Sequence, residues 1–214
     1  MPAFETLAAD LPHHSHSGAY AALVIRGSYE EAGDRGRFGV RADDVVLHEC
    51  FEAHLDRVGA RGATVVNIAL PPDACLRHTF GTVSDPGAVL AAPRERAGAL
   101  LLSMFEPSLP ASRDWPDVLA AALIADPFLD LTHWSDTARL APWTVTRGFE
   151  RVFGIAPSRF RVRARARRAW NAIRTTRAPL VAIAAACGFA DQAHMTRAVR
   201  ALTGAPPMTW RRCK

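Results

Sequence analysis

Short runs of apolar and β-branched residues, broken by glycine, proline and Ala-Asp-Asp turns, fill the chain between residues 17 and 70. The pattern predicts strands at residues 20–26, 37–41, 45–48, 53–58 and 63–70. Glycines at positions 27 and 62 are interpreted as turns between strands. Several short strands at close spacing are typical of an antiparallel barrel or sandwich, and we expect a small β-barrel over residues 1–84.

Residues 85–114 are predicted to form a short helical connector and linker. One stretch with a helical pattern, residues 94–105, has Pro93 at its start and Pro107 just past its end. Residues 110–114 are predicted to be the linker to the rest of the chain.

From residue 115 onward the pattern is helical. Proline in the first turn, aspartate at the N-cap and glycine after the last turn mark the boundaries. The expected helices cover residues 116–124, 131–138, 142–153, 157–175, 180–187, 191–202 and 207–211. This order predicts two helix-turn-helix units joined by a linker helix, in a domain of residues 115–214. The fold class is therefore α+β, a small β-barrel followed by an all-α domain.

Charge is distributed unevenly between the two predicted halves. The chain carries a formal net charge of +5, from 26 basic and 21 acidic residues. Residues 139–214 contain 15 arginines and one lysine against two acidic residues, which gives this segment +14 and leaves −9 for residues 1–138. A basic module joined to an acidic one is typical of a protein that binds a polyanion through one of its halves.

The composition is that of a globular protein, since 49% of the residues are hydrophobic. No apolar run approaches the roughly 20 residues that span a bilayer. The first ten residues, MPAFETLAAD, lack the basic region and apolar core of a secretory signal. Four scattered cysteines without a C-x-x-C pair indicate reduced thiols in a cytoplasmic protein: Cys50, Cys75, Cys187 and Cys213.

The most informative segment is residues 183–211, IAAACGFADQAHMTRAVRALTGAPPMTWR. A small-residue helix stops at Gly188, and a helix with a polar, basic face follows. The run G-F-x-D-Q-x-H, then T-R, Arg200, G-x-x-P and an aromatic residue with Arg211, resembles the C-terminal signature of the AraC/XylS family of bacterial transcription regulators. The resemblance extends back to about residue 130 and weakly through the N-terminal half, which is similar to the cupin-like sensor half of many such regulators.

The second helix of each unit is expected to contact DNA. The candidate residues are Trp143, Thr144, Thr146 and Arg147 in the first unit and Gln192, Ala193, His194, Thr196 and Arg197 in the second. Arginine matches the O6 and N7 acceptors of guanine, and glutamine matches N6 and N7 of adenine. By resemblance to the family, Trp143, Arg147, Gln192 and Arg197 fall at or near base-reading positions. A core position is the alternative for Trp143, and a surface or phosphate contact is slightly preferred for His194.

Arginines crowd the predicted linker helix, where Arg161, Arg165 and Arg168 share one face. Arg161 and Arg168 are expected to contact phosphates, which position a protein without specifying sequence; a solvated basic face is an equal alternative. The resemblance implies a structural role for Arg165, because the family often keeps an arginine there.

The first unit departs from the family pattern. Arg139 stands where Gly is common, and Ala141 replaces a capping Ser. Gly148 lies inside the recognition helix at a cost of about 1 kcal/mol, and Glu150 stands where the family tends to be basic. We therefore expect the first unit to bind DNA more weakly than the second.

Histidines cluster in the N-terminal half. The sequence His14-Ser15-His16 places two imidazoles on one face of an extended segment, and His54 lies on a later strand. With a carboxylate such as Glu30 or Glu31, neutral imidazoles at this spacing suit Fe, Zn, Mn or Ni. Three interpretations stay open: part of an organic effector pocket, a metal site, and ordinary strand or loop residues.

The leading hypothesis is a cytoplasmic transcription regulator, not an enzyme, whose barrel binds a small-molecule effector. Its expected partners are double-stranded DNA and that effector, with RNA polymerase and a second copy of the chain as further candidates. No catalytic residue, cofactor or resident metal is assigned. The alternative is a metal-dependent cupin enzyme or metal sensor with an attached basic domain, which requires an ordered metal at His14, His16 and His54.

Overall fold

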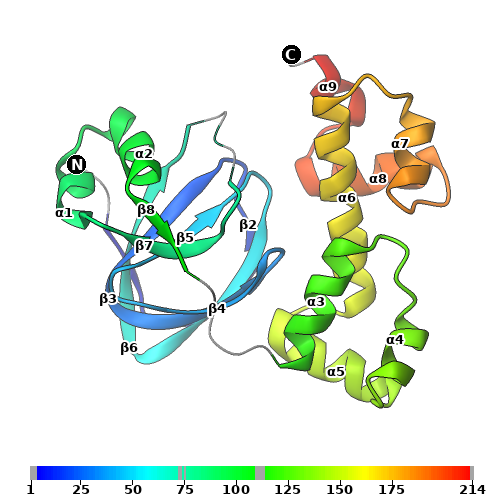
Figure 1. Cartoon of the computed structure of the whole chain (residues 1–214), viewed down its shortest axis with the longest axis horizontal. Helices are drawn as coiled ribbons and strands as arrows, with labels where there is room; N and C mark the ends of the chain where they lie inside the picture. The colour runs from blue at the N-terminus through cyan, green and yellow to red at the C-terminus, as the bar shows by residue number, and fades with distance from the viewer. Residues whose placement is uncertain (1–3, 72–73, 75, 109–113, 213–214) are drawn as a thin grey trace. The chain divides into compact units, whose positions relative to one another are not determined.

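The computed structural model describes residues 4–71, 74, 76–108 and 114–212. The chain divides between residues 113 and 114 into a unit built on a β-sheet and a unit of helices, which confirms the predicted α+β class (Figure 1). Within the described ranges, no helix is long and apolar enough to cross a membrane. Cys50 and Cys187 form no disulfide with any described residue, and Cys75 and Cys213 lie outside the described residues.

One antiparallel sheet forms the frame of the N-terminal unit. Its strands are β1 (Phe4–Leu7), β2 (Leu11–Ser15), β3 (Tyr20–Gly33), β4 (Gly36–Arg41), β5 (Asp44–His48), β6 (Ala53–Ala69), β7 (Phe80–Val83) and β8 (Phe105–Pro107). The main order is β1-β6-β3-β5-β7-β8, with β2 paired to β6 and β4 paired to β3. The long strands β3 and β6 curve strongly, so the sheet wraps around an interior (Figure 1).

Gly27 and Gly62 bend strands and do not end them, which corrects the predicted turns. Both glycines have positive φ, +80° and +69°, and the pairing register of β3 with β6 shifts on either side of Gly27. A Cβ on Gly27 would lie 2.0 Å from the carbonyl oxygen of Gly62, so only glycine permits this approach of the two backbones. The strands predicted at 53–58 and 63–70 are therefore one bulged strand, and the strand predicted at 20–26 continues to Gly33.

The sheet buries apolar side chains on both faces, because successive residues of its strands alternate between two clusters. The outer cluster includes Leu23 and Val45. The inner cluster includes Val24 and Val46 and lies on the opposite face, which lines the interior of the curved sheet.

The segment predicted as a separate connector packs on the sheet. Val89 of α1 (Pro86–Ala91) and Leu101 of α2 (Arg94–Ser103) are buried in the outer cluster, and β8 pairs with β7. Residues 86–107 thus belong to the N-terminal unit. Of the linker predicted at residues 110–114, only Asp114 is described.

The helices of the C-terminal unit lie close to their predicted positions. They are α3 (Trp115–Ala125), α4 (Leu131–Thr137), α5 (Pro142–Phe153), α6 (Pro157–Thr175), α7 (Leu180–Ala186), α8 (Gln192–Thr203) and α9 (Pro207–Arg212). The side chain of Asp130 accepts hydrogen bonds from the first backbone N–H groups of α4, as its predicted capping role requires. Gly154 and Gly188 follow α5 and α7 with positive φ, +71° and +76°.

The long helix α6 is the spine of this unit and packs against α3, α5, α7, α8 and α9. Near its start, Phe160 meets Phe149 and Phe153 of α5, and all three rings are fully buried. Near its end, Trp170 packs edge-on against Trp210 of α9, with 5.8 Å between ring centroids. One helix therefore contributes to the cores of both halves of the unit.

Gly148 has a packing role that the sequence did not reveal. A Cβ at this position of α5 would lie 2.4 Å from Cζ2 of Trp115, the first residue of α3. The missing side chain lets the indole ring lie directly against the α5 backbone, so the intrinsic cost of glycine in a helix is offset by this close packing.

Replacing Gly148 with Ala should therefore destabilise the C-terminal unit, although Ala is the better helix former. We expect a loss of about 1–3 kcal/mol in the free energy of unfolding, as is usual for overpacking. All five tryptophans lie in this unit, so urea unfolding followed by tryptophan fluorescence reports on it. Gly39→Ala is the control, because a Cβ there meets nothing within 4 Å; a more stable Gly148→Ala protein would contradict the packing role.

Candidate nucleic-acid interface and histidine cluster

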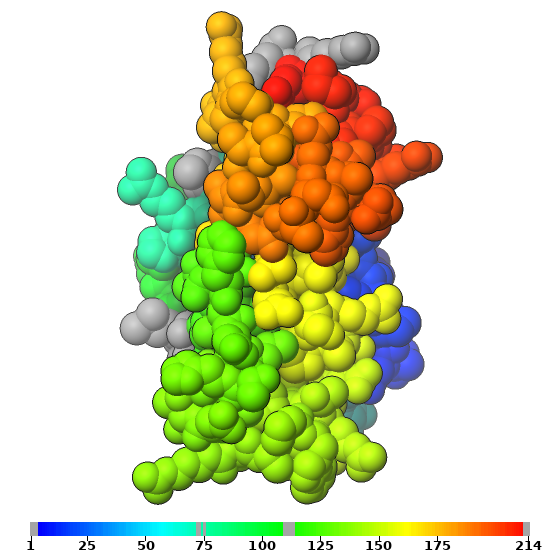
Figure 2. Space-filling view, turned by 90° about the vertical axis from the view of Figure 1, so that its right-hand side faces the viewer, coloured from blue at the N-terminus to red at the C-terminus, as the bar shows by residue number. Residues whose placement is uncertain are grey.

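Two helix-turn-helix pairs are mounted on α6. The first consists of α4 and α5 and the second of α7 and α8. Figure 2 shows the first pair in green at one end of a face of the C-terminal unit and the second in orange at the other end, with yellow α6 between them. As the second helix of each pair, α5 and α8 hold the position of recognition helices.

The outward face of α8 carries the contacts predicted for the second unit. The exposed residues are Gln192, Ala193 and Arg197, and the half-buried residues are His194 and Thr196. Met195 and Val199 on the opposite face are fully buried. Asp191 caps the helix by accepting a hydrogen bond from the His194 backbone N–H at 2.6 Å. The outward side chains are therefore held on a well-anchored helix.

The first unit presents α5 in the same way. Its four predicted contacts are also outward or half-buried: Trp143, Thr146 and Arg147 are exposed, and Thr144 is half-buried. Trp143 is 65% exposed, so it is not a core residue. The Thr146 hydroxyl donates to the Pro142 carbonyl at 3.0 Å.

The backbone before α5 shows the two defects expected from the sequence. Arg139 has a φ of 54°, in the left-handed region that costs energy for a residue other than glycine. Ala141 provides no side-chain hydrogen bond to the start of α5, whereas Asp191 provides one to α8. The recognition helix of the first unit is thus less firmly anchored than that of the second.

Three arginines of α6 hold the end of α3 and the segment that follows it. The donor and acceptor pairs are Arg161 Nη1 to Leu129 O at 2.9 Å, Arg165 Nε to Pro127 O at 2.6 Å, and Arg168 Nη2 to Ile124 O and Ala125 O at 3.0 and 2.9 Å. The carbonyls at the C-terminal end of a helix lack helical partners, and the helix dipole favours a cation there.

Arg165 has the structural role that the resemblance implied. A Cβ on Gly188 would lie 3.0 Å from Arg165 Nε and 2.8 Å from Pro127 O, so the turn of the second unit lies against this contact. Arg161 and Arg168 also donate to backbone carbonyls, a structural role that the sequence did not predict. Each guanidinium has five N–H donors, of which these carbonyl bonds use only some, and Arg161 Nε is buried.

Arg165→Ala should lower the free energy of unfolding of the C-terminal unit by about 1.5–3 kcal/mol, because the Pro127 carbonyl loses a charged donor. Tryptophan fluorescence during urea unfolding measures the change. Arg159→Ala, which removes an exposed arginine of the same helix, should stay within about 0.5 kcal/mol of the original protein. Equal unfolding curves for the two variants would remove the structural role of Arg165.

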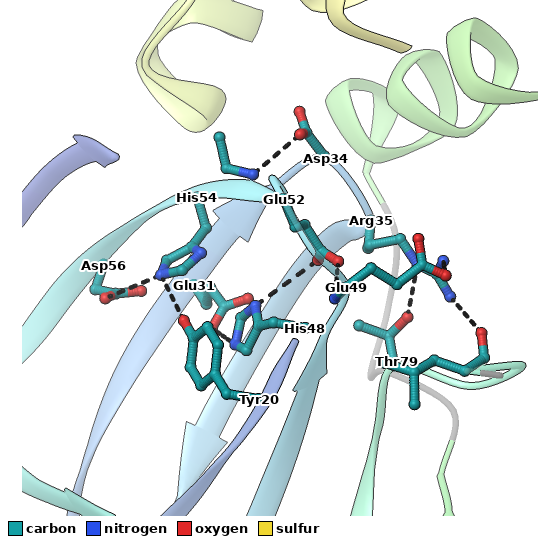
Figure 3. A network of polar contacts seen from close by, with 12 residues as sticks. Tyr20, Glu31, Asp34, Arg35, His48, Glu49, Glu52, His54, Asp56 and Thr79 are labelled. Carbon is teal, nitrogen blue, oxygen red and sulfur yellow. Dashed lines mark hydrogen bonds and ion pairs between the residues drawn. The ribbon is translucent and has the colours of Figure 1, made fainter. Parts of the chain in front are cut away.

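A group of polar side chains lies inside the curved sheet, and Figure 3 shows several of its buried members. This histidine cluster consists of His14, His16, Tyr20, Glu31, His48, His54 and Asp56. Strand register explains its assembly, because His14 is paired with His54 across β2 and β6, and Tyr20 with His48 across β3 and β5. Paired residues of neighbouring strands project to the same face.

The structure brings the three predicted histidines together and adds residues to them. His14 and His54 have ring centroids 4.3 Å apart, and His14 and His16 have theirs 5.0 Å apart. Of the two carboxylates considered, Glu31 joins the cluster, whereas Glu30 accepts a hydrogen bond from Arg57. Sequence reasoning missed Asp56 and Tyr20 and gave His48 no role; strand alternation from His54 to Asp56 was the available signal for Asp56.

Close polar contacts connect the buried members of the cluster (Figure 3). His48 Nε2 lies 3.5 Å from Glu31 Oε2, and His48 Nδ1 lies 3.8 Å from Glu52 Oε1. His54 Nε2 lies 3.5 Å from the Tyr20 hydroxyl and 3.9 Å from Asp56 Oδ2.

Burial favours the uncharged form of each of these groups. It lowers the pKa of His54 to about 3, with a further contribution from His14 and His16, and lowers the pKa of His48 well below its usual value. Burial also raises the pKa of Asp56 to about 6 and that of Glu31 well above its usual value. The buried histidines are therefore neutral near pH 7, which is the form that coordinates metals.

Two helix-turn-helix pairs with exposed recognition helices, in a strongly basic domain, are typical of DNA-binding proteins. Residues 134–213 match the family model described as a helix-turn-helix domain. This segment is therefore a helix-turn-helix domain of the AraC type. No curated protein matches the chain.

Similar solved structures cover either the helical unit or nearly the whole chain. The C-terminal domain of AraT, a response regulator from Geobacillus stearothermophilus, is 19% identical, with 46% of this chain and 84% of that chain covered and a TM-score of 0.43. The DNA-binding domain of AdpA, in complex with a target DNA, is 20% identical, with 47% and 92% covered and a TM-score of 0.44. ToxT from Vibrio cholerae is 8% identical, with 99% and 95% covered and a TM-score of 0.46.

Proposed function

We propose that the C-terminal unit reads a specific duplex sequence with α5 and α8, and that a small effector in the interior of the N-terminal sheet controls this binding. The observation that carries the reading role is the outward exposure of both recognition helices on one unit. Arg147 and Arg197 are suited to guanine, and Gln192 to adenine. Trp143, Thr144, Thr146, Ala193, His194 and Thr196 complete the two contact surfaces.

The two helix-turn-helix units contribute unequally to sequence specificity in this proposal. The strained Arg139 and the missing cap at Ala141 leave the first recognition helix less fixed than the second, and the exposed Glu150 repels phosphate. The second unit therefore supplies the larger share of base recognition, and the first mainly extends the footprint to the next major groove.

Arg197→Ala should weaken binding to the preferred duplex by about 1–3 kcal/mol, the usual value of one bidentate contact with guanine. Arg147→Ala should cost less, because its helix is less firmly anchored. Selection of bound genomic fragments defines the duplex, and gel-shift titration measures the affinity. Arg96→Ala is the control, because it removes an exposed arginine from the N-terminal unit; an unchanged footprint for Arg197→Ala would remove this residue from the interface.

Phosphate contact is proposed for the donors of Arg161 and Arg168 that are not used on carbonyls. Arg168→Ala should lower the affinity for every duplex sequence alike and reduce the slope of log K against log salt by about 1. Titrations at several salt concentrations, at a temperature where the variant is fully folded, measure this slope. A loss confined to the preferred sequence would contradict a phosphate contact.

The sensor role is proposed for the interior that the histidine cluster lines. Regulation requires that the effector bind more tightly to one arrangement of the two halves than to another. A metal-dependent enzyme is the second candidate, and it draws on the same histidines. RNA polymerase and a second copy of the chain are proposed as further partners of the regulator.

A further inference from the structure

The histidine cluster combines a solvent-accessible rim with a buried centre. His16 is exposed and His14 is half-buried, while His54 is only 3% exposed. His14 lies near the end of β2, His16 directly follows this strand, and His54 lies on β6. An incoming ion can therefore meet His16 first and His54 last.

We propose that His14, His16 and His54 bind a divalent first-row transition-metal ion. One ligand nitrogen from each of the three rings lies within 4.8 Å of the other two. Metal–nitrogen bonds of about 2.0–2.1 Å in a tetrahedral site place the nitrogens about 3.3 Å apart. The exposed ring of His16 and the half-buried ring of His14 can close this difference by rotation, without displacing a core strand.

The ring orientations suit coordination. His14 Nδ1 donates to the Pro12 carbonyl at 2.8 Å, which fixes the tautomer and leaves Nε2 with a free lone pair. His54 Nε2 lies near Tyr20 and Asp56, and a carboxylate beside the second ring nitrogen is the usual support of a metal-bound histidine. These neighbours orient the ligands from outside the coordination sphere.

Several buried polar atoms in and around His54 make no hydrogen bond to the described residues. His54 Nδ1, both ring nitrogens of His48 and Asp56 Oδ1 have no hydrogen-bond partner among the described residues. Such atoms are costly in an apolar interior, and each needs a physical explanation. Glu31, His48 and His54 form a second group of donors with the same spacing, so an ion bound at His54 lies close to additional ligands.

The space available favours an ion over an organic molecule. The cavity lined by the cluster has a volume of about 50 Å³, whereas pockets for organic ligands usually measure about 300–1,000 Å³. Imidazole donors favour Zn, Ni, Cu, Co or Fe, whereas Mg and Ca prefer sites built from oxygen atoms. The occupant is therefore a transition-metal ion, and its role as the effector rests on the proposed sensor function.

Metal titration of the full chain tests the site. The protein, free of any histidine tag and dialysed against a chelator, is titrated with ZnCl₂, NiCl₂ and CaCl₂ by calorimetry, and with CoCl₂ by visible absorption. We expect one Zn or Ni ion per chain, no saturable Ca binding, and a cobalt spectrum of nitrogen coordination. His14→Ala and His16→Ala should each weaken Zn binding at least tenfold, and His78→Ala, an exposed histidine of the same unit, should not.

His14 and His16 lie at the rim of the cluster, so their replacement should leave the fold intact. Thermal unfolding of His14→Ala and His16→Ala verifies this. His54→Ala removes a buried ring, and its binding is interpreted only together with that of the rim variants. Unchanged Zn affinity in His14→Ala and His16→Ala, or equal binding of Ca and Zn, would overturn the metal site.

A gel shift on the preferred duplex with and without Zn tests the effector role separately. A change in DNA affinity that disappears in His16→Ala supports metal as the effector, and an unchanged affinity overturns it. If DNA is bound specifically and Arg197→Ala weakens that binding while metal has no effect, the DNA-reading proposal stands and the metal-effector proposal fails.

Discussion

The geometry of the DNA-binding unit depends on charged hydrogen bonds from one face of α6 to the end of α3. Helix α6 touches both helix-turn-helix pairs, but apolar packing alone permits sliding of one helix along another. The guanidinium groups of Arg161, Arg165 and Arg168 bind backbone carbonyls, which have fixed positions. Because Arg165 also lies against Gly188, the turn of the second unit is set by the contact that positions the first.

The interior of the N-terminal sheet combines two kinds of packing on one face. Val24 and Val46 belong to an ordinary apolar core, while Tyr20 and His48, further along the same strands, lie in a polar group. Removing imidazoles and carboxylates from water costs free energy that an apolar core would not. The inner cluster and the helix-covered outer cluster bury apolar surface, and this burial offsets the cost. The N-terminal unit can therefore stay folded while it retains the histidine cluster, which does not itself stabilise the fold.

The sequence predicts the helical unit well because its boundary signals are local. Asp130, Gly154 and Gly188 each act within one helix end, and they act as expected. The turns predicted at Gly27 and Gly62 are wrong, and the packing of Gly148 is not predicted, because these roles depend on residues distant in the chain. Gly27 and Gly62 face one another across two strands, and Gly148 faces Trp115. The histidine cluster was half predicted for the same reason. The spacing of His14 and His16 is local, whereas Asp56 joins them through strand pairing.

The proposed metal ligands lie on strands that differ in how firmly they are hydrogen-bonded into the sheet. This difference affects how binding of an ion could change the protein's conformation. His54 lies on β6, a central strand paired with β1, β2 and β3. His14 lies on β2 and His16 directly follows it, and among the described strands β2 pairs only with β6, through an interrupted register. Within the described sheet, β2 is thus a short peripheral strand held by few hydrogen bonds. Coordination would join this strand to the centre of the sheet by bonds much stronger than its own pairing, and a ligand that fixes a weakly held segment can change the population of conformations available to the whole chain.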